Sequence, residues 1–322
     1  MKRLAFSLAL LTLTGIAGAS AQTYPTRAVT IIVPFAAGGP ADITGRIAAD
    51  QLTKQLGGQF VVENVGGAGG TTGATRAARA APDGYTLLLG HLGTQAAAVA
   101  LYPKLAYNPE TDFEPVGMVG EQPELLVIRK ALPPNNLKEF IAYAKANESK
   151  LNMAHAGVGS VSYTGCLLFN TAIGIKPTLV PFTGTAPVLN AMLANQVDYV
   201  CDPILGPLPH VRAGTLKALA ITSGKRHPAL PDVPTSAEGG LPQFNLTIFF
   251  GLFAPKGTPQ AVVDKLAAAL DKGLDDPTAR KRLTDLGAAI PDKNRRGPKP
   301  LAGLVKSEIA RLTPILSAAG AK

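Results

Sequence analysis

The chain has 322 residues, of which 46% are hydrophobic, and its formal net charge at pH 7 is +9. This hydrophobic content indicates a packed globular protein, and the length exceeds what one core supports, so we expect two lobes. The basic residues are scattered except at 293–299, a run typical of a solvated surface. No nucleic-acid module signature accompanies that run, so we expect no nucleic acid partner.

The N-terminal segment has the three parts of a secretory signal peptide. Residues 2–3 are basic, residues 4–18 are apolar, and residues 19–21 (ASA) form a small-residue cleavage site. The apolar stretch is short of the roughly 20 residues that a membrane-spanning helix needs, so a retained anchor is the less favoured alternative. We therefore expect residues 1–21 to be removed and the mature protein to be periplasmic.

Short β-branched runs alternate with amphipathic helical stretches in the first third of the chain. The stretch 43–58 reads as a helix because its apolar residues recur on one face and glycines end it. Such strand–helix alternation predicts a parallel α/β sheet. In chain order, we expect a strand at 28–35, a helix at 43–58, a strand at 59–64, a glycine-rich loop and helix at 65–81, and a strand at 84–90.

The same alternation restarts after residue 123, and a segment rich in proline and glycine at 226–244 interrupts it later. In the predicted helix 258–274, Thr258 and Pro259 are typical N-cap and first-position residues. The expected elements are strands at 124–129, 150–157, 177–182, 197–202, 216–223 and 247–255, and helices at 136–147, 161–174, 186–196, 258–274 and 301–320.

The restart predicts two α/β lobes of similar size, each a mostly parallel sheet flanked by helices. The expected crossings between them lie near 116–124 and 218–232. If the chain crosses over and returns, residues 22–120 form the first part of lobe 1, residues 121–229 form lobe 2, and residues 230–322 return to lobe 1. Periodicity alone does not establish the return.

Three loops of Gly, Ser, Thr and Ala share one design. Residues 35–42, 157–163 and 182–188 each join the end of a predicted strand to the start of a predicted helix. Helix N-termini present unpaired backbone N–H groups and a positive dipole end, so such loops suit anions. Ligands of open α/β sheets bind at the carboxyl ends of strands, so loops from two facing lobes would converge on one cleft. Taken singly, each loop is equally well explained as a chain turn with a helix cap.

Two aspartates near these loops each have two interpretations. With Gly39 as N-cap, Asp42 stands at the third helical position, where a carboxylate stabilises the helix N-terminus. We favour this capping role over contact with a donor group of a ligand. Asp202 ends the strand at 197–202 and is either a loop cap or an acceptor at the cleft.

Signatures of known catalytic and cofactor sites are absent from the sequence. There is no phosphate-binding P-loop, no dinucleotide fingerprint, no nucleophile elbow and no zinc-protease helix. We expect no enzyme activity, no cofactor and no metal site. A pair of Ser160 and His91 has no sequence support, and His155 is interpreted as a packed residue. None of the four histidines has metal-ligand spacing; they are His91, His155, His210 and His227.

The sequence contains two cysteines, Cys166 and Cys201. An exported protein meets an oxidising compartment, which permits a disulfide. Cys166 is expected on a helix and Cys201 near the end of a strand. The sequence leaves a disulfide and two buried thiols equally open.

Together, these segments resemble the Bug-type (TctC-like) receptors, which are periplasmic solute-binding proteins of tripartite tricarboxylate transporters. The similarity covers essentially the whole mature chain and includes "YPTRAVTIIVPFAAGGPADITGRIAA" (24–49), "VVENVGGAGGTTGATRAARAAPDGYTLLLG" (61–90) and "LVPFTGTAPVLNAMLANQVDYVCD" (179–202). The resemblance implies a two-lobed type II periplasmic-binding-protein fold, a small organic anion held between the lobes, and delivery to the membrane subunits of such a transporter. We expect a monomer.

The resemblance also implies which residues contact the ligand. They come from the three glycine-containing loops, from a segment after the strand at 84–90, and from the end of the strand at 197–202. The implied residues are Phe35, Ala37, Gly38, Gly39, Asp42, Thr94, Gln95, Gly157, Gly159, Ser160, Tyr163, Thr183, Gly184, Thr185, Ala186 and Asp202.

The chain departs from the family pattern in ways that bear on the ligand. Gln95 and Tyr163 stand where the family often has His, Thr183 where it often has Lys, and residues 249–250 are Phe where it often has Trp. Losing His and Lys removes cationic contacts, while Tyr163 and Phe35 add ring surface. We therefore expect an aromatic or otherwise partly apolar carboxylate rather than citrate.

An extracytoplasmic solute-binding receptor is the favoured function. One alternative is a periplasmic ligand sensor that partners a histidine kinase, which the sequence does not separate from uptake. A less favoured alternative is a cleft hydrolase, which needs a nucleophile–base pair within hydrogen-bond reach.

Overall fold

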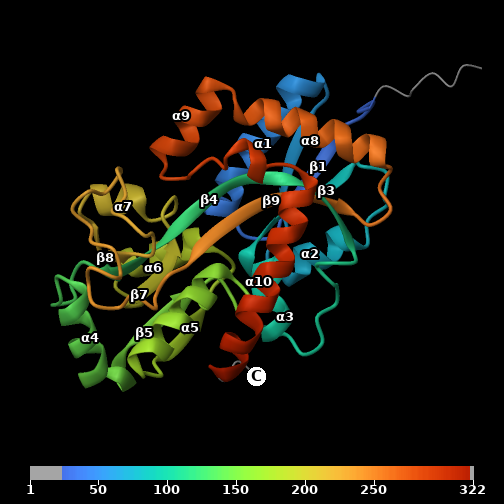
Figure 1. The fold of residues 1–322 in the computed structure, drawn as a ribbon. Helices are drawn as coiled ribbons and strands as arrows, with labels where there is room; N and C mark the ends of the chain where they lie inside the picture. Colours follow the sequence, from blue (N-terminus) through green and yellow to red (C-terminus); the bar gives the residue numbers. More distant parts are fainter. Residues whose placement is uncertain (1–23, 320–322) are drawn as a thin grey trace, which may run out of the picture.

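The computed structural model describes residues 24–319, which form two connected β-sheets wrapped by helices (Figure 1). The predicted signal peptide lies outside the described residues. The strands are β1 (Val29–Val33), β2 (Phe60–Asn64), β3 (Thr86–His91), β4 (Phe113–Arg129), β5 (Asn152–His155), β6 (Thr178–Pro181), β7 (Tyr199–Pro203), β8 (Leu216–Ile221) and β9 (Thr247–Pro255).

The α-helices cover both sheets. They are α1 (Pro40–Leu56), α2 (Thr71–Ala78), α3 (Ala98–Leu101), α4 (Leu137–Ala146), α5 (Val161–Ile173), α6 (Thr185–Leu193), α7 (Leu208–Arg212), α8 (Gln260–Leu274), α9 (Pro277–Asp285) and α10 (Pro298–Ala318). Short 3-10 turns lie at η1 (Ala68–Gly70), η3 (Glu148–Lys150) and η4 (Lys293–Arg295), and a π-helical turn lies at η2 (Gly93–Ala97). Within residues 24–319, every helix is too short or too polar to span a bilayer.

The first sheet has the order β2-β1-β3-β9-β4, and the second is built from β4, β7, β8, β5 and β6. The predicted α/β class is confirmed, but the sheets are mixed. In the described chain, β1 pairs in parallel with β2 and β3, and β5 pairs in parallel with β6 and β7. All pairings made by β4 and β9 are antiparallel, and these two long strands run through the middle of the molecule.

Strand β4 belongs to both sheets. Its first part pairs with β9 as far as Pro123, which is opposite Thr247, and its second part begins at Glu124, which is opposite Pro203 of β7. The division into two lobes stays a prediction, and this pairing supports it with shifted bounds. The expected return at residue 230 comes too early, because the segment around Thr235 still bonds to Ile221 of β8.

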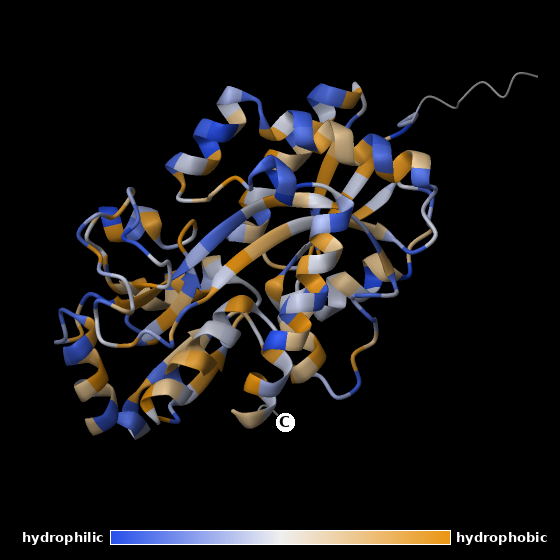
Figure 2. Ribbon diagram, viewed as in Figure 1, coloured by the Kyte–Doolittle hydropathy of each residue, from blue (hydrophilic) through white to orange (hydrophobic). Residues whose placement is uncertain are grey.

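The buried strands explain why the sequence folds this way. All residues of β1 except Thr30 are fully buried, as is typical of parallel strands covered on both faces. Helix α1 packs against α8 on one side of the first sheet, and α10 packs against β4 and α3. Figure 2 shows that α9 is mostly hydrophilic, whereas α5, most of whose residues are buried, is mostly hydrophobic.

One predicted helix start is wrong by a residue. Pro259, not Thr258, is the N-cap of α8, because its ψ of 133° is extended and the helix begins at Gln260. The Thr258 hydroxyl instead donates to the carbonyl of Pro255 and closes the turn after β9. The element was predictable from its apolar spacing, whereas its first residue depended on this turn.

Candidate ligand-binding site

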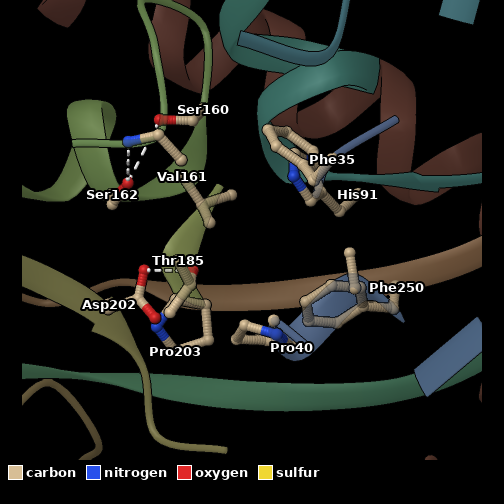
Figure 3. Close-up of a pocket in the computed structure, with 13 residues that line it drawn as sticks. Phe35, Pro40, His91, Ser160, Val161, Ser162, Thr185, Asp202, Pro203 and Phe250 are labelled. Atoms are coloured by element: carbon tan, nitrogen blue, oxygen red, sulfur yellow. Dashed lines mark hydrogen bonds between the residues drawn. The ribbon is translucent and has the colours of Figure 1, made fainter. Parts of the chain in front are cut away.

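A small cavity lies where loops of the two sheets meet (Figure 3). The space free of atoms between its lining residues, part of which opens to solvent, is about 310 Å³, and little of it is wider than a water molecule. A ligand larger than water therefore needs the surrounding loops to separate before it enters. The lining residues are Phe35, Gly39, Pro40, Ala41, His91, Ala156, Ser160, Val161, Ser162, Thr185, Asp202, Pro203 and Phe250.

Three helices begin at this cavity. Their N-caps are Gly39 for α1, Ser160 for α5 and Gly184 for α6. A helix N-terminus carries about half an elementary positive charge and backbone N–H groups without helical partners. Among the described residues, those that line the cavity include no Lys or Arg. The positive potential in the cavity therefore comes from helix ends on both sides of it.

Hydroxyl groups fix the start of α5. The Oγ of Ser160 accepts from the backbone N–H of Tyr163 at 3.1 Å, which is an N-cap bond. The same Oγ lies 3.2 Å from the Oγ of Ser162, which accepts from the N–H of Ala156 at 3.0 Å. Ser160 is thus a cavity residue and a structural cap at once.

The carboxylate of Asp42 stabilises the loop at residues 35–42 through hydrogen bonds. Its carboxylate accepts from the N–H of Gly38 at 2.9 Å, from Nδ2 of Asn64 at 3.0 Å and from Nε of Arg46 at 3.0 Å. Burial alone would raise the pKa of this carboxyl, but the hydrogen bonds and the charge of Arg46 bring its pKa below the usual value. Asp42 stands at the third position of α1, so the structure gives the capping role that we favoured.

His91 is the main cavity residue that the sequence did not single out for ligand binding. Its ring stacks on Phe35 with centroids 4.9 Å apart and meets Phe250 edge-on at 5.7 Å. The Nδ1 atom accepts from the N–H groups of Gly93 at 3.0 Å and Thr94 at 3.2 Å, so the proton of the neutral ring resides on Nε2. Burial lowers the pKa of His91 to about 4, so the ring is neutral at pH 7.

Two buried carboxyl groups lie at the carboxyl end of the second sheet. Asp202 lines the cavity, and its Oδ1 accepts from the hydroxyl of Thr185 at 2.9 Å. Among the described residues, Oδ2 of Asp202 and both side-chain oxygens of Glu124 have no hydrogen-bond partner. Burial raises the pKa of Asp202 to about 8, and burial together with the charge of Asp202 raises the pKa of Glu124 well above its usual value.

The loops of the two sheets touch around the cavity. The N–H of Ala36 donates to the carbonyl of Thr183 at 3.1 Å. A Cβ on Gly69 would lie 1.5 Å from the carbonyl oxygen of Val158, so these two loops meet backbone to backbone. The hydroxyl of Tyr102 lies 2.7 Å from the carbonyl of Ala68 and 2.5 Å from that of Val158, so it bridges the same contact. We call this contact of residues 66–70 and 157–159 the glycine seam.

The structure sorts the implied ligand residues into three groups. Phe35, Gly39, Ser160, Thr185 and Asp202 line the cavity. A second group lies on the loops that meet around it without lining it; these residues are Ala37, Gly38, Gly157, Gly159, Thr183, Gly184 and Ala186. As ligand contacts, all of these residues stay predictions.

The third group lies outside the cavity. Asp42 caps α1, and the hydroxyl of Thr94 bonds the backbone of His91. Gln95 packs its side chain at Gly90 in β3 and is fully buried there, which differs from the expectation. The ring of Tyr163 packs edge-on against His155 at 5.0 Å, because α5 turns that side chain away from the cavity.

Several lining residues were not expected. Pro40, Ala41, Val161 and Ser162 lie within the predicted loops 35–42 and 157–163 but were not among the residues implied to contact the ligand. The remaining unexpected residues sit at strand ends, where the sequence alone does not show which side chain faces the neighbouring sheet. They are His91, Ala156, Pro203 and Phe250.

The two cysteines lie on neighbouring elements of the second sheet. Cys166 on α5 and Cys201 on β7 are joined in a disulfide, with their Cα atoms 5.2 Å apart. Both residues are fully buried, and Cys201 directly precedes Asp202. The bridge therefore links the helix that begins at Ser160 to the strand that ends beside the cavity. Within residues 24–319, no group of three His, Cys, Asp or Glu side chains is placed to hold a metal ion.

Residues 44–320 match the profile of the tripartite tricarboxylate transporter family receptor, TctC. MatC (Rpa3494) from Rhodopseudomonas palustris, solved with bound malate, is 51% identical, with a TM-score of 0.89 over 91% of this chain and 100% of that one. The periplasmic binding protein BugD is 42% identical, with a TM-score of 0.90 over 93% of this chain and 99% of that one. R. palustris Rpa4515, solved with adipate, is 33% identical, with a TM-score of 0.87 over 92% and 98%.

Proposed function

Because this chain belongs to the tripartite tricarboxylate transporter receptor family, whose members are solute-binding receptors, we propose that it captures a small dicarboxylate in the periplasm. The loaded receptor then delivers the ligand, as a monomer, to the membrane subunits of such a transporter. The residues that contact the ligand are those lining the cavity.

One observation carries the proposal: three helix N-termini from the two sheets face one cavity. Free N–H groups at the starts of α1, α5 and α6 can bond carboxylate oxygens, and each hydrogen bond to a charged group contributes about 1.5–3 kcal/mol. Micromolar affinity needs about −8.2 kcal/mol beyond the costs of association, so several such bonds must act together with other contacts in the cavity.

The lining of the cavity favours a small dicarboxylate over an aromatic acid. MatC, at 51% identity, was solved with malate. The expected preference for an aromatic acid depended on Phe35 and Tyr163. One face of Phe35 is covered by His91, and Tyr163 lies outside the cavity, so the site offers less free ring surface than expected.

The glycine seam gives the closing step a structural basis. Loops that meet backbone to backbone around the cavity must part to admit the ligand and must meet again to enclose it. The N–H of Ala36 and the hydroxyl of Tyr102 bond across the contact, and these bonds stabilise the closed arrangement.

We assign no catalytic role to the cavity. The Oγ of Ser160 accepts the cap bond from Tyr163, and Nδ1 of His91 accepts two backbone N–H groups. These groups are therefore committed to holding the backbone rather than to each other, which supports a binding site over a nucleophile–base pair.

Isothermal titration calorimetry with malate, succinate, adipate, citrate and benzoate tests the proposal. We expect malate or succinate to bind with micromolar affinity and benzoate to bind at least tenfold more weakly. Tight benzoate binding would restore the aromatic preference, and a wild-type protein that binds none of the five acids would refute the proposed function.

Variants at helix caps separate binding from stability. Ser160→Ala should weaken malate binding by about tenfold because it loosens the start of α5, and it should cost about 1 kcal/mol of stability. Asn136→Ala removes the N-cap of α4, which accepts from Glu139, far along the chain from the cavity. It should cost similar stability and leave malate affinity unchanged; equal affinities for both variants would remove Ser160 from the site.

A second pair of variants tests the glycine seam. Gly69→Ala places a Cβ against Val158 at a φ of +60° and should lower malate affinity at least tenfold by preventing closure. Gly57→Ala introduces a Cβ at a similar φ of +71° with nothing within 4 Å, so it carries the backbone strain alone. If Gly69→Ala binds malate as tightly as Gly57→Ala does, closure does not depend on the seam.

A further inference from the structure

Asp202 leaves one polar atom unused in the cavity wall. The residue is 1% exposed and sits near the end of β7, facing the start of α6 (Figure 3). The Thr185 hydroxyl donates to Oδ1, so that oxygen is satisfied. Oδ2 has no partner within the described residues. A buried polar atom without a partner costs about 1–3 kcal/mol, so a partner supplied by a ligand would stabilise the complex.

The surroundings of Oδ2 place it at the meeting point of both sheets. A Cβ on Gly206 would lie 2.8 Å from Oδ2, 2.8 Å from the methyl group of Thr185 and 3.2 Å from Pro40. Oδ2 is thus closely packed beside two lining residues, one from each side of the cavity. Glycine at position 206 permits this close approach, because a Cβ there would clash with Oδ2.

The charges around Asp202 favour its neutral form. Burial raises the pKa of Asp202 to about 8, although the hydrogen bond from Thr185 acts in the opposite direction. Glu124 on β4 is a second buried acid nearby, and His91 on β3 and His155 on β5 have lowered pKa values from burial, so neither adds a positive charge at pH 7. Asp42 on α1 is paired with Arg46. An incoming carboxylate would disfavour ionisation of Asp202 further.

We propose that Asp202 is a specificity-determining residue that carries a proton on Oδ2 and donates it in a hydrogen bond to a carboxylate oxygen of the ligand. This inference rests on the proposed function, because it needs a carboxylate in the cavity. It follows that the site selects a carboxylate at this position over an ammonium group. A neutral carboxyl donates to a carboxylate but offers little to a cation, whereas an ionised Asp202 would do the reverse.

The test follows malate affinity from pH 6 to pH 9.5 by calorimetry, a range in which both malate carboxyls are ionised. For the wild type, we expect constant affinity up to about pH 8 and then a loss approaching tenfold per pH unit, as Asp202 loses its proton. Asp202→Asn keeps the shape and offers an N–H donor in place of the O–H. It should bind malate within about threefold of the wild type at pH 7 and lose the fall above pH 8.

Two further variants complete the test. Asp202→Ala lacks any donor and should bind malate at least tenfold more weakly at pH 7. Glu124→Gln removes the other buried acid and should keep the wild-type fall above pH 8, which assigns the titration to Asp202. Infrared spectra of the ligand-free protein give an independent readout, because the band of a protonated carboxyl should disappear at high pH and be weaker in Asp202→Asn.

The inference is overturned if Asp202→Asn, folded as judged by circular dichroism, binds malate as weakly as Asp202→Ala at pH 7. That result would mean that an ionised Asp202 accepts a hydrogen bond from the ligand. A wild-type affinity that rises with pH, or a fall above pH 8 that persists in Asp202→Asn, overturns it as well. These outcomes differ from a failure of the proposed function, in which the wild type binds none of the small acids at pH 7.

Discussion

Asp42 and Asp202 belong to two regions with the same plan, a strand end followed by a loop at the cavity, but their carboxyl groups have opposite surroundings. Asp42 receives hydrogen bonds from Gly38, Asn64 and Arg46, and its pKa is lowered. Asp202 receives a single hydrogen bond, from Thr185, and burial raises its pKa to about 8.

The difference shows what each region contributes. The charged carboxylate of Asp42 holds the loop before α1 in place through hydrogen bonds, and all of its partners belong to the protein itself. Asp202 is left with an unused oxygen beside the cavity, while its own strand is held by the disulfide at Cys201. The first region is thus fixed by hydrogen bonds to a carboxylate and the second by a covalent bond, which leaves its carboxyl available.

Removal of the disulfide should have the largest effect on stability. The double variant Cys166→Ala/Cys201→Ala opens a link between residues separated by 35 positions, and we expect it to lower the free energy of unfolding by about 3–4 kcal/mol. Urea denaturation measures this change. A loss below about 1 kcal/mol would mean that packing of α5 on β7 holds the second region without the bridge.

Asp42→Ala should have the next largest effect, a loss of about 3 kcal/mol. The buried carboxylate that accepts from Gly38, Asn64 and Arg46 disappears, and the N–H of Gly38 loses its acceptor, whereas Asn64 keeps its bond to the carbonyl of Phe35. The dependence of the free energy of unfolding on pH shows whether Asp42 acts as a carboxylate. The folded pKa of Asp42 is lowered, so its contribution is present above the unfolded pKa and is lost as pH falls through the folded value. The stability difference from wild type should therefore shrink in strong acid; a constant difference would contradict the ionised role.

Asp202→Asn should stabilise the protein, in contrast to the variants above. Between about pH 4 and pH 8 the unfolded Asp202 is ionised while the folded one keeps its proton, so wild-type stability falls with rising pH, by at most about 1.4 kcal/mol per unit. Asn does not titrate, so we expect Asp202→Asn to be about 1–3 kcal/mol more stable than wild type at pH 8 and nearly equal to it at pH 4. Thermal denaturation at both pH values measures this, and a destabilised variant at pH 8 would show that Asp202 is ionised.

Arg46→Gln should have the smallest effect. Arg46 pairs with Asp42 four residues earlier on α1, but its side chain is 48% exposed. Exposed pairs of this kind contribute about 0.3–0.5 kcal/mol, so the change in urea midpoint should be slight. A loss above about 1.5 kcal/mol would show that Arg46, rather than Gly38 and Asn64, supports the carboxylate.

The sequence predicted the elements and the three loops because these depend on local patterns. The apolar spacing of α1 and the glycines before it identified a helix start, and Asp42 was placed at the third position of that helix. The sequence did not predict the long strand β4, whose two halves pair in different sheets, because pairing between distant segments leaves no local pattern.

The site was predictable only in part. The loop residues Gly39, Ser160 and Thr185 reach the cavity because helix starts at strand ends must lie there. His91 and Phe250 were missed because the direction of a side chain at a strand end depends on the neighbouring sheet. The position of Gln95 was not predictable because the π-helical turn after β3 directs its side chain back to Gly90.

The source of positive potential in the cavity has one more consequence. It resides in main-chain groups at the starts of α1, α5 and α6, in a space that a water molecule barely enters. At 0.1 M salt, dissolved ions largely screen the attraction between exposed charges that lie more than about 10 Å apart, but they screen buried groups much less. A receptor of this kind keeps its affinity when its surroundings change from dilute to saline, whereas one that relied on surface lysines would lose it.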